Sequence, residues 1–473
     1  MNKNDLGKFF ILGFQHGIKK HHIDLIKEIK PAGIILYPSN MRSLSDLQLS
    51  IERLHEIIDD GVRLFISSDH EGGQLETVPG ILPSPGNKAL GASNEPHYAY
   101  IFGDFLGNEL RKIGFNMLFA PVLDVRANKS SPVVGLRSFS DNPKIVAEYG
   151  VNFLKGLNNH IIGTCKHFPG HGKAMQDSHH EIPIIPNLDE NDLYPFMKAI
   201  EAGAEAIMTA HIIYPQYDDN IIATLSKTIL KNLLREKMGY QGLIITDALE
   251  MKAIHDNYSP REIVSKFFNA TGDLLLVGDC DANFEPLYKE LISLYSNGEI
   301  DKQLLENSFN RITSLQNQFV EPNYEARFLT EISKKAIKTN INEKLNFSEI
   351  TFLVPQGDPL SPSDTSNKDY YEYTDLIRNL FENPQITTFN FENGKINGSL
   401  EKTELIVSFV VDSFLFEKQL KMQKEIKEYA NQVIYIILRD ERDLQNYKTE
   451  KYVLTNSTKA VSVYYALKTI FDI

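Results

Sequence analysis

The sequence predicts an α/β protein, a (β/α)8 barrel of the TIM type followed by a smaller C-terminal α/β sandwich-like domain. Two observations indicate the barrel. Eight short apolar runs alternate with segments of helical periodicity, and reactive polar residues gather where the runs end. Apolar strands that alternate with helices are typical of parallel sheets covered on both faces. An open doubly wound sheet would alternate similarly, but no glycine-rich dinucleotide fingerprint follows an early strand.

The elements follow one another in the order that eight βα units require. Each predicted strand is short and rich in β-branched residues, and the predicted helices between them are longer. The predicted strands are residues 9–14, 33–37, 63–69, 117–125, 161–167, 206–211, 243–247 and 273–278, and the clearest helices are 43–59, 98–113, 142–157, 188–202 and 227–238.

The chain has 473 residues, more than one ordinary core accommodates, so we expect two domains. The polar stretch at 317–325 marks a boundary, and we predict a barrel at 1–320, a linker at 321–330 and a C-terminal domain at 331–473. A loop rich in Pro, Ser and Asp is predicted at 357–369, with Asp358, Asp364 and Asp369 as solvated turn residues. The predicted C-terminal elements are helices 331–339, 416–430 and 459–471 and strands 350–354, 405–411, 433–438 and 452–454.

Charge and composition exclude several classes of protein. The formal charge is −13, which does not suit binding to nucleic acid or an anionic membrane. The two cysteines, Cys165 and Cys280, lie in apolar runs and are interpreted as buried reduced thiols. No run reaches transmembrane length, and the apolar run 9–14 is too short for a secretory core. We therefore expect a cytoplasmic protein that does not bind membranes.

Polar residues lie at the predicted carboxyl ends of five strands, where the active sites of such barrels are found. A single acidic residue after a strand is ordinarily a cap for the next helix. Polar residues at the ends of five strands are harder to explain by capping, and they favour an active site at this end of the barrel. These residues are Asp69, Asp124, the pair Lys166 and His167, His211, and Asp247.

The densest cluster runs from Cys165 to His180. Asp177 precedes His179 by two residues and could hold one nitrogen of its ring, which leaves the other nitrogen for acid/base work. His171 and His180 are interpreted as loop-structuring or solvated histidines. Arg137 could bind substrate or staple a loop through a salt bridge. His211 could contact a ligand or satisfy a backbone group.

These segments resemble glycoside hydrolase family 3, and in particular its bacterial β-N-acetylhexosaminidase branch. The resemblance rests on Lys166-His167-Phe168-Pro169-Gly170-His171-Gly172 followed by Asp177-Ser178-His179, and it covers residues 5–315 strongly. Supporting segments appear in the family's order: Asp69-His70-Glu71-Gly72-Gly73, Leu82-Pro83-Ser84-Pro85, 119–125, Arg137-Ser138-Phe139, Met208-Thr209-Ala210-His211 and Thr246-Asp247-Ala248-Leu249-Glu250-Met251.

The resemblance implies a retaining exo-β-N-acetylglucosaminidase of the peptidoglycan-recycling type, acting on muropeptides through a covalent glycosyl–aspartate. Asp247 would be the nucleophile, His179 the acid/base and Asp177 the residue that orients His179. Asp69, Arg137, Lys166 and His167 would bind the sugar, and we place His211 with them. No metal or organic cofactor is implied. The expected partner is a glycan containing N-acetylglucosamine, and the expected assembly is a monomer or weak homodimer.

The sequence departs from the family pattern at two positions. Gln74 and Thr77 occupy positions where the family commonly has Arg, so this chain lacks two positively charged guanidinium groups. The catalytic trio is unchanged, so we expect activity with an altered substrate or leaving-group side. Three alternatives stay open: a β-N-acetylglucosaminide phosphorylase, a non-catalytic sugar-binding protein, and a metal-dependent barrel hydrolase that uses His167, His171, Asp177 and His211.

Overall fold

The structure is a computed structural model that describes residues 3–15, 17–127, 133–175, 181–318, 327–357 and 367–473. It separates into two compact units. Met1–His16, Leu25–Arg42 and Leu54–Glu325 form the first, and Gly17–Asp24, Ser43–Arg53 and Ala326–Ile473 form the second. The predicted boundaries at 320 and 331 stay a prediction, and helix α11 (Arg327–Ala336) begins four residues before the helix predicted there.

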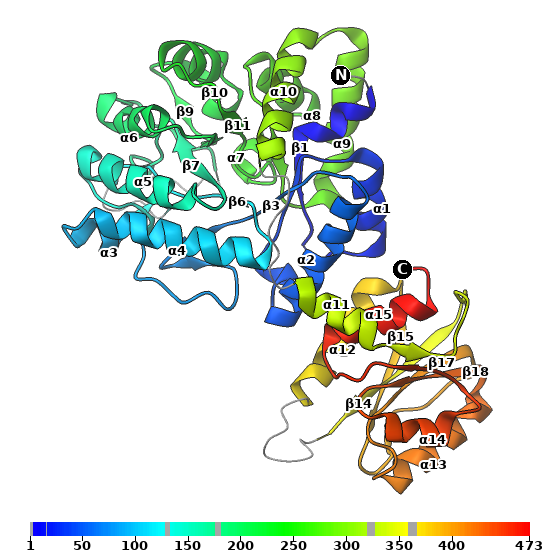
Figure 1. The fold of residues 1–473 in the computed structure, drawn as a ribbon. Helices are drawn as coiled ribbons and strands as arrows, with labels where there is room; N and C mark the ends of the chain where they lie inside the picture. The colour runs from blue at the N-terminus through cyan, green and yellow to red at the C-terminus, as the bar shows by residue number, and fades with distance from the viewer. Residues whose placement is uncertain (1–2, 16, 128–132, 176–180, 319–326, 358–366) are drawn as a thin grey trace. The chain divides into compact units, whose positions relative to one another are not determined.

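Eight parallel strands form the predicted barrel, each pairing with the next along the chain (Figure 1). Strand β1 pairs with β12, and a parallel bridge between Ile245 and Leu274 joins the last two strands, so the ring is nearly closed. All eight predicted strands are present. They are β1 (Phe10–Gly13), β2 (Gly33–Ile35), β3 (Phe65–Ser68), β6 (Met117–Leu118), β7 (Ile162–Phe168), β8 (Ala206–Thr209), β11 (Leu243–Ile245) and β12 (Leu275–Val277).

Four of the described helices of the barrel, α5, α6, α8 and α9, begin at side-chain caps that the sequence supplies. Asn142 accepts a hydrogen bond from the amide of Lys144 at the start of α5, and Asp189 forms a capping box with Asp192 at the start of α6. The α-helices are α1 (Lys20–Ile29), α2 (Leu44–Asp59), α3 (Asn87–Ala92), α4 (His97–Ile113), α5 (Pro143–Leu157), α6 (Glu190–Glu201), α7 (Lys252–His255), α8 (Pro260–Asn269), α9 (Cys280–Asn297) and α10 (Lys302–Gln318).

One predicted helix differs in type. The segment predicted at 227–238 is a π-helix, η5 (Thr228–Lys237), in which the Met238 amide donates to the Leu233 carbonyl five residues earlier. The described residues of this part also form four short 3-10 helices and two small hairpins: η1 (Lys3–Phe9), η2 (Pro38–Asn40), η3 (Gly135–Arg137), η4 (Ala223–Leu225), β4 (His70–Gly72) with β5 (Leu75–Glu76), and β9 (Ile213–Tyr214) with β10 (Asp218–Ile222).

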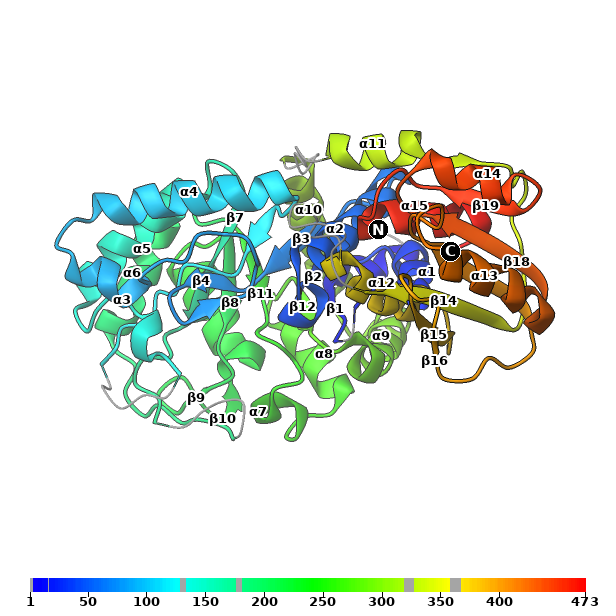
Figure 2. The ribbon, with the colours of Figure 1, turned by 90° about the horizontal axis from the view of Figure 1, so that it is seen from below.

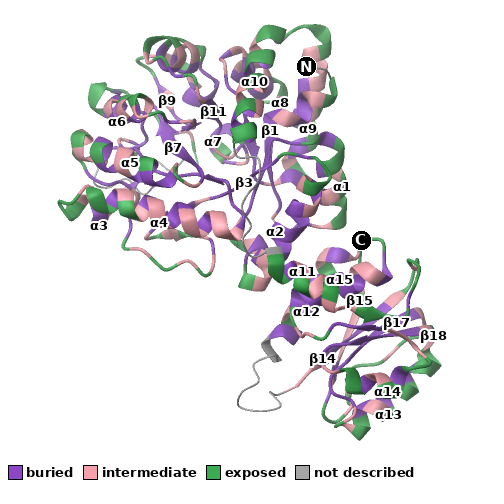
Figure 3. Ribbon diagram, viewed as in Figure 1, coloured by how far each residue is buried: buried purple, intermediate pink, exposed green. Residues whose placement is uncertain are grey.

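The barrel strands are buried along their whole length, as Figure 3 shows, whereas the helices expose one side. Ile11, Ile34 and Ile66 on three neighbouring strands are completely inaccessible to solvent. Removing this apolar surface from water stabilises the ring, and it explains why the strands read as unbroken apolar runs. The polar residues that follow each strand are thereby held at one end of a rigid core.

The C-terminal unit is a second α/β structure built on a seven-stranded sheet. Its five central strands are parallel, in the order β19-β18-β17-β14-β15, with β13 and β16 antiparallel at the two edges. Figures 1 and 2 show α11, α12 and α15 over one face and α13 and α14 over the other. The elements are β13 (Lys338–Thr339), β14 (Ile350–Gln356), α12 (Asn367–Leu380), β15 (Gln385–Asn390), β16 (Ile396–Asn397), β17 (Thr403–Val410), α13 (Glu417–Glu425), η6 (Ile426–Tyr429), β18 (Ala430–Ile437), η7 (Glu441–Asp443), α14 (Leu444–Tyr447), β19 (Lys451–Leu454) and α15 (Ala460–Ile470).

One prediction in this unit is wrong. Asp369 is not a solvated turn residue, because it lies in the first turn of α12, is buried, and accepts hydrogen bonds from Lys459 Nζ (3.0 Å) and Thr458 Oγ1 (2.9 Å). An acidic residue in a first helical turn is favoured by the helix dipole, so Asp369 helps α12 to begin. Asp358 and Asp364 lie outside the described residues.

Two further sequence expectations concern thiols and membranes. Cys165 and Cys280 are buried and unpaired, as predicted, and burial raises the pKa of the Cys280 thiol to about 12. Among the described residues, no helix has both the length and the apolar character needed to cross a bilayer.

Candidate active site

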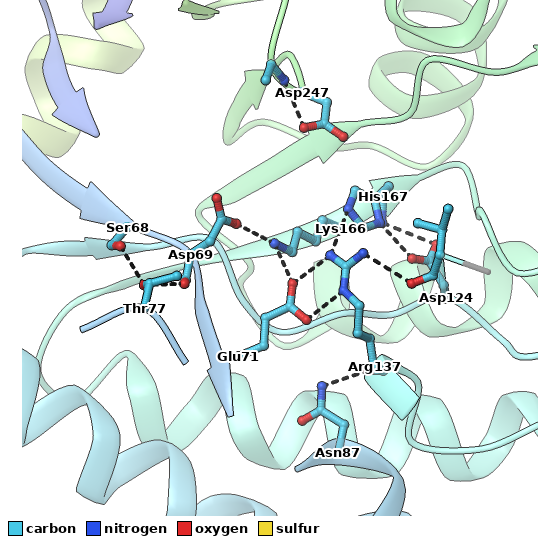
Figure 4. A network of polar contacts seen from close by, with 12 residues as sticks. Ser68, Asp69, Glu71, Thr77, Asn87, Asp124, Arg137, Lys166, His167 and Asp247 are labelled. Atoms are coloured by element: carbon cyan, nitrogen blue, oxygen red, sulfur yellow. Dashed lines mark hydrogen bonds and ion pairs between the residues drawn. The ribbon is translucent and has the colours of Figure 1, made fainter. Parts of the chain in front are cut away.

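The carboxyl ends of β3, β7 and β11 bring four predicted site residues to one mouth of the barrel. Asp69 directly follows β3, Lys166 and His167 lie near the carboxyl end of β7, and Asp247 follows β11 by two residues. Figure 4 shows Asp69, Lys166 and His167 side by side, with Asp247 opposite them. Parallel strands place their carboxyl ends together, so residues distant in sequence meet here.

Lys166 lies between two carboxylates. Its Nζ is 2.6 Å from Asp69 Oδ1 and 2.6 Å from Glu71 Oε1, and only 2% of its side chain is exposed. Burial alone would lower the pKa of Lys166, but Asp69 and Glu71 raise it above the ordinary value. The ammonium group is therefore charged throughout the neutral range.

Arg137 forms a bidentate ion pair with the same Glu71. Its Nη2 donates to Glu71 Oε1 at 2.7 Å and its Nε donates to Oε2 at 2.9 Å (Figure 4). Burial would raise the pKa of Glu71, but Lys166 and Arg137 lower it far below the usual range. Glu71 is thus an ionised, fully buried counterion shared by two cations.

Glu71 is the residue that our sequence reasoning missed. In the sequence it belongs to the segment Asp69-His70-Glu71-Gly72-Gly73, and its signal there is a carboxylate directly before two glycines. The network leaves Asp69 as the accessible member, since 28% of its side chain is exposed against 13% for Arg137 and 1% for Glu71. A partly open carboxylate beside fixed cations suits recognition of sugar hydroxyls.

His167 is oriented by Asp124, the acid in the loop after β6. Its Nδ1 lies 2.7 Å from Asp124 Oδ2, and neither side chain is more than 6% exposed. Burial would raise the pKa of Asp124, but His167 and other donors lower it, so the carboxylate stays ionised. An ionised acceptor requires a proton on Nδ1, and Nε2 of the ring faces Arg137 Nη2 at 3.5 Å.

The loop after β7 is anchored at its base. The His171 amide donates to Asp124 Oδ1 at 2.6 Å, and burial together with His167 lowers the pKa of the His171 ring to about 4. A Cβ on Gly172 would lie 1.7 Å from the Val125 carbonyl oxygen, so only glycine fits there. These contacts agree with a loop-structuring role for His171. Asp177, His179 and His180 lie outside the described residues.

Asp247 is half-buried, and its carboxylate is held at one oxygen. The Ala248 amide donates to Oδ1 at 2.8 Å. Burial would raise the pKa of Asp247, but His167, His211, this amide and Lys166 together lower it. The carboxylate is therefore ionised at neutral pH, and among the described residues Oδ1 is the oxygen with a hydrogen-bond donor, which leaves Oδ2 for chemistry.

His211 follows β8 and is 1% exposed. Its Nε2 lies 3.1 Å from the Ala248 carbonyl and its Nδ1 lies 2.7 Å from Thr224 Oγ1. Burial lowers the pKa of the ring, so His211 is neutral. Both ring nitrogens have protein partners, which favours the second of the two roles that the sequence left open.

Thr77 and Gln74 lie on the hairpin formed by β4 and β5. The Thr77 hydroxyl is 2.5 Å from the Asp69 carbonyl and 2.9 Å from Ser68 Oγ, and the Thr77 amide donates to His70 Nδ1 at 3.1 Å (Figure 4). Gln74 is exposed. Thr77 therefore fastens the hairpin beneath Asp69 and supplies no positive charge.

Two family models match the chain. The glycosyl hydrolase family 3 N-terminal domain matches residues 8–315, and the β-N-acetylglucosaminidase C-terminal domain matches residues 348–470. The first match covers the entire barrel, including every site residue described above.

Individual relatives agree with these models. β-Hexosaminidase A from Pseudoalteromonas piscicida is 31% identical over 324 residues, which is 62% of this chain and 54% of that protein. The chain thus spans about half the length of this relative. A β-hexosaminidase from Hydrogenovibrio crunogenus is 31% identical over 272 residues, 55% of this chain and 75% of that protein.

Solved structures match over nearly the full length. The β-N-acetylglucosaminidase from Thermotoga maritima has 35% identity and a TM-score of 0.84, covering 98% of this chain and 100% of its own. CbsA from Thermotoga neapolitana has 31% identity and a TM-score of 0.83, with 98% of both chains covered.

Proposed function

This chain belongs to glycosyl hydrolase family 3, and we propose that it is an exo-β-N-acetylglucosaminidase that removes terminal β-linked N-acetylglucosamine. The observation that supports this most directly is the mouth itself. An ionised Asp247 stands opposite a set of fixed hydroxyl-binding groups, in a chain similar over nearly its whole length to a β-N-acetylglucosaminidase. We propose muropeptides derived from peptidoglycan as the natural source of the sugar.

The proposed reaction has two steps and retains the anomeric configuration. Asp247 Oδ2 attacks C1 of the sugar, and the glycosidic oxygen leaves with a proton from His179. A water molecule then gives a proton to His179 and attacks C1, which breaks the bond to Asp247 and releases the sugar. Asp177 orients His179 in both steps, and one imidazole suits both because its neutral and protonated forms are accessible near pH 7.

The sugar-binding roles follow from the network around Lys166. We propose that Asp69 accepts hydrogen bonds from sugar hydroxyls, that Lys166 and Arg137 donate to the sugar, and that His167 contacts it through the Nε2 side of its ring. Glu71 binds no sugar in this scheme. Its charge keeps the two cations, Lys166 and Arg137, fixed beside the sugar.

The first test compares an aryl β-N-acetylglucosaminide with the matching aryl β-glucoside. We expect preferential hydrolysis of the first, and a 5-fluoro glycosyl fluoride of N-acetylglucosamine should leave a covalent label on Asp247, located by peptide mass spectrometry. Asp247→Ala should lower kcat by at least about 10⁴-fold, whereas sugar binding should persist. A label on any other residue would overturn the mechanism.

The same assay separates the alternatives. Reaction in phosphate buffer that yields sugar 1-phosphate would establish a phosphorylase instead of a hydrolase. Loss of activity after exhaustive chelation, restored by added metal, would establish a metal-dependent enzyme. Binding without turnover in the unaltered protein would establish a sugar-binding protein.

A further inference from the structure

His211 lies at the end of β8, completely buried beside the segment that holds Asp247. It is one of the few titratable groups at the mouth to which the proposed chemistry gives no task. Its two hydrogen bonds determine where its proton lies. The Ala248 carbonyl can only accept, so Nε2 of His211, at 3.1 Å, must be the donor.

A neutral ring with its proton on Nε2 has an accepting Nδ1. Because burial lowers the pKa of His211, this is the form present, and the Thr224 hydroxyl lies 2.7 Å from Nδ1 and 3.0 Å from the Ala210 carbonyl oxygen, so its single proton is shared between these two acceptors. The Thr209 hydroxyl, 2.9 Å from Thr224 Oγ1, can donate in turn to Thr224. All three side chains are buried, so the chain of hydrogen bonds fixes the tautomer and the plane of the ring.

The other end of this chain reaches the nucleophile. Ala248 is held at its carbonyl oxygen by His211, and its amide donates to Asp247 Oδ1 at 2.8 Å. A single residue is therefore held on one side by the ring while it holds the carboxylate on the other. If the ring releases the carbonyl, the Asp247–Ala248 segment can turn and carry Oδ2 away from C1.

We propose that His211 is a positioning residue, and not a sugar ligand, that orients Asp247 Oδ2 by fixing Ala248. This inference rests on the proposed role of Asp247 as nucleophile. It assigns Thr224 to the same task, one step further from the reaction. A displacement of about 1 Å at a reacting group lowers rates by roughly 100-fold, which sets the expected size of the effect.

The test uses substitutions that keep or remove the donor at the Nε2 position. Gln reaches that position with an amide N–H, whereas Asn reaches only the Nδ1 position and Phe supplies no donor. With an aryl β-N-acetylglucosaminide we expect kcat to fall about 100-fold in His211→Phe and His211→Asn, with KM within about threefold of the original. His211→Gln should recover most of the loss.

Thr224 provides the matched pair. Thr224→Val removes the hydroxyl and keeps the shape, and it should lower kcat by about 5- to 10-fold, whereas Thr224→Ser should be close to the unaltered enzyme. Circular dichroism and thermal unfolding of each variant distinguish misfolding from mispositioning. Since His211→Gln and Thr224→Val make small changes in volume, the proposal stays testable even if His211→Phe does not fold.

Three outcomes would reject the proposal. KM rising with kcat unchanged would make His211 a sugar ligand. Equal loss of kcat in His211→Gln and His211→Phe would show that the Nε2 donor is irrelevant. Full activity in His211→Phe would show that the imidazole ring is irrelevant. Failure of the proposed function is distinguishable, because the unaltered protein would then turn over no aryl β-N-acetylglucosaminide at all.

Discussion

Glu71 is enclosed by Lys166 and Arg137, and all three side chains are largely withdrawn from water. A buried ion pair contributes little compared with an apolar replacement, but removing one partner leaves the other charge uncompensated. In this network the Glu71 carboxylate is shared by both cations, and Asp69 pairs with Lys166 alone. Loss of the Glu71 carboxylate therefore affects both stability and the placement of the groups proposed to bind sugar.

We predict that Glu71→Gln destabilises the protein by about 3–5 kcal/mol and lowers kcat/KM by at least about 100-fold. The amide keeps the shape and one acceptor but carries no charge, so Lys166 and Arg137 repel each other. Urea unfolding measures the first effect and steady-state kinetics the second.

Glu285→Gln is the control for charge removal. Glu285 pairs with Lys289 four residues later on α9, and 75% of its side chain is exposed. Such surface pairs contribute about 0.5 kcal/mol or less, so this variant should be unchanged in both measurements. Equal behaviour of the two variants would contradict the role assigned to Glu71.

The position of a residue at the end of a strand predicts most of this site, but it does not predict Glu71. Asp69, Lys166 and Asp247 were identifiable because strand position alone places them at the mouth. Glu71 lies beyond the strand, on a hairpin, and its partners come from the β7 end and from η3. No local pattern in the sequence states which cations such a carboxylate will meet.

The hairpin of β4 and β5 is hydrogen-bonded to the backbone of Asp69 at the end of β3. Thr77 closes it through its hydroxyl, which contacts the Asp69 carbonyl and Ser68 Oγ. We predict that Thr77→Val raises KM about 3- to 10-fold with a smaller change in kcat, because a neutral hydrogen bond contributes about 0.5–1.5 kcal/mol. Steady-state kinetics with the aryl glycoside measures this.

Thr77→Ser supplies the matched control, since it keeps the hydroxyl and loses only a methyl group. It should stay within about twofold of the unaltered enzyme in KM. A rise in KM for both variants would assign the effect to packing of the methyl group and not to the hydrogen bond.

Elements were predictable where they bury a continuous apolar face. All eight barrel strands were found for that reason, whereas α12 and β15 in the C-terminal unit were missed. Strand β15 has one buried residue, Phe389, among six, so its sequence lacks the apolar run that marks the other strands. The π-helix η5 was read as an ordinary helix, because over ten residues the side-chain periods of the two helix types are too similar to separate.

At the scale of the whole molecule, the alternation of strands and helices was enough to predict a parallel barrel, since neighbours in sequence are neighbours in space. The C-terminal sheet does not follow that rule. Its chain order is β14, β15, β17, β18, β19, but β14 lies between β15 and β17. This order depends on pairing between distant segments, which the sequence does not display.

The C-terminal unit contains a buried carboxyl group whose ionisation acts against folding. Asp443 is inaccessible to solvent, and its Oδ1 accepts from the Ser413 hydroxyl at 2.6 Å and the Phe414 amide at 3.0 Å. Among the described residues, Oδ2 has no hydrogen-bond partner. Burial, with a contribution from nearby Asp412, raises the pKa of Asp443 from 3.8 to about 6.

The sign of the pH dependence follows from this shift. A carboxyl group whose pKa is higher in the folded state favours folding when it is protonated, so its contribution is complete below the unfolded pKa near 4 and is lost as pH rises through about 6. The shift of about 2 pH units corresponds to about 3 kcal/mol, or about 100-fold in an opening equilibrium.

We predict that Asp443→Asn removes this contribution. Hydrogen exchange of the full chain, followed by mass spectrometry, gives the protection of the amides in β17 and β18. The protection in Asp443→Asn divided by the protection in the unaltered protein should rise by up to about 100-fold between pH 4 and pH 7. Intrinsic exchange rates cancel in that ratio at each pH. Asp375→Asn on α12, a partly exposed acid of the same unit, should give a ratio that does not change with pH. A flat ratio for Asp443→Asn would mean that this carboxyl group is ionised in the folded unit at little cost, which would contradict the prediction.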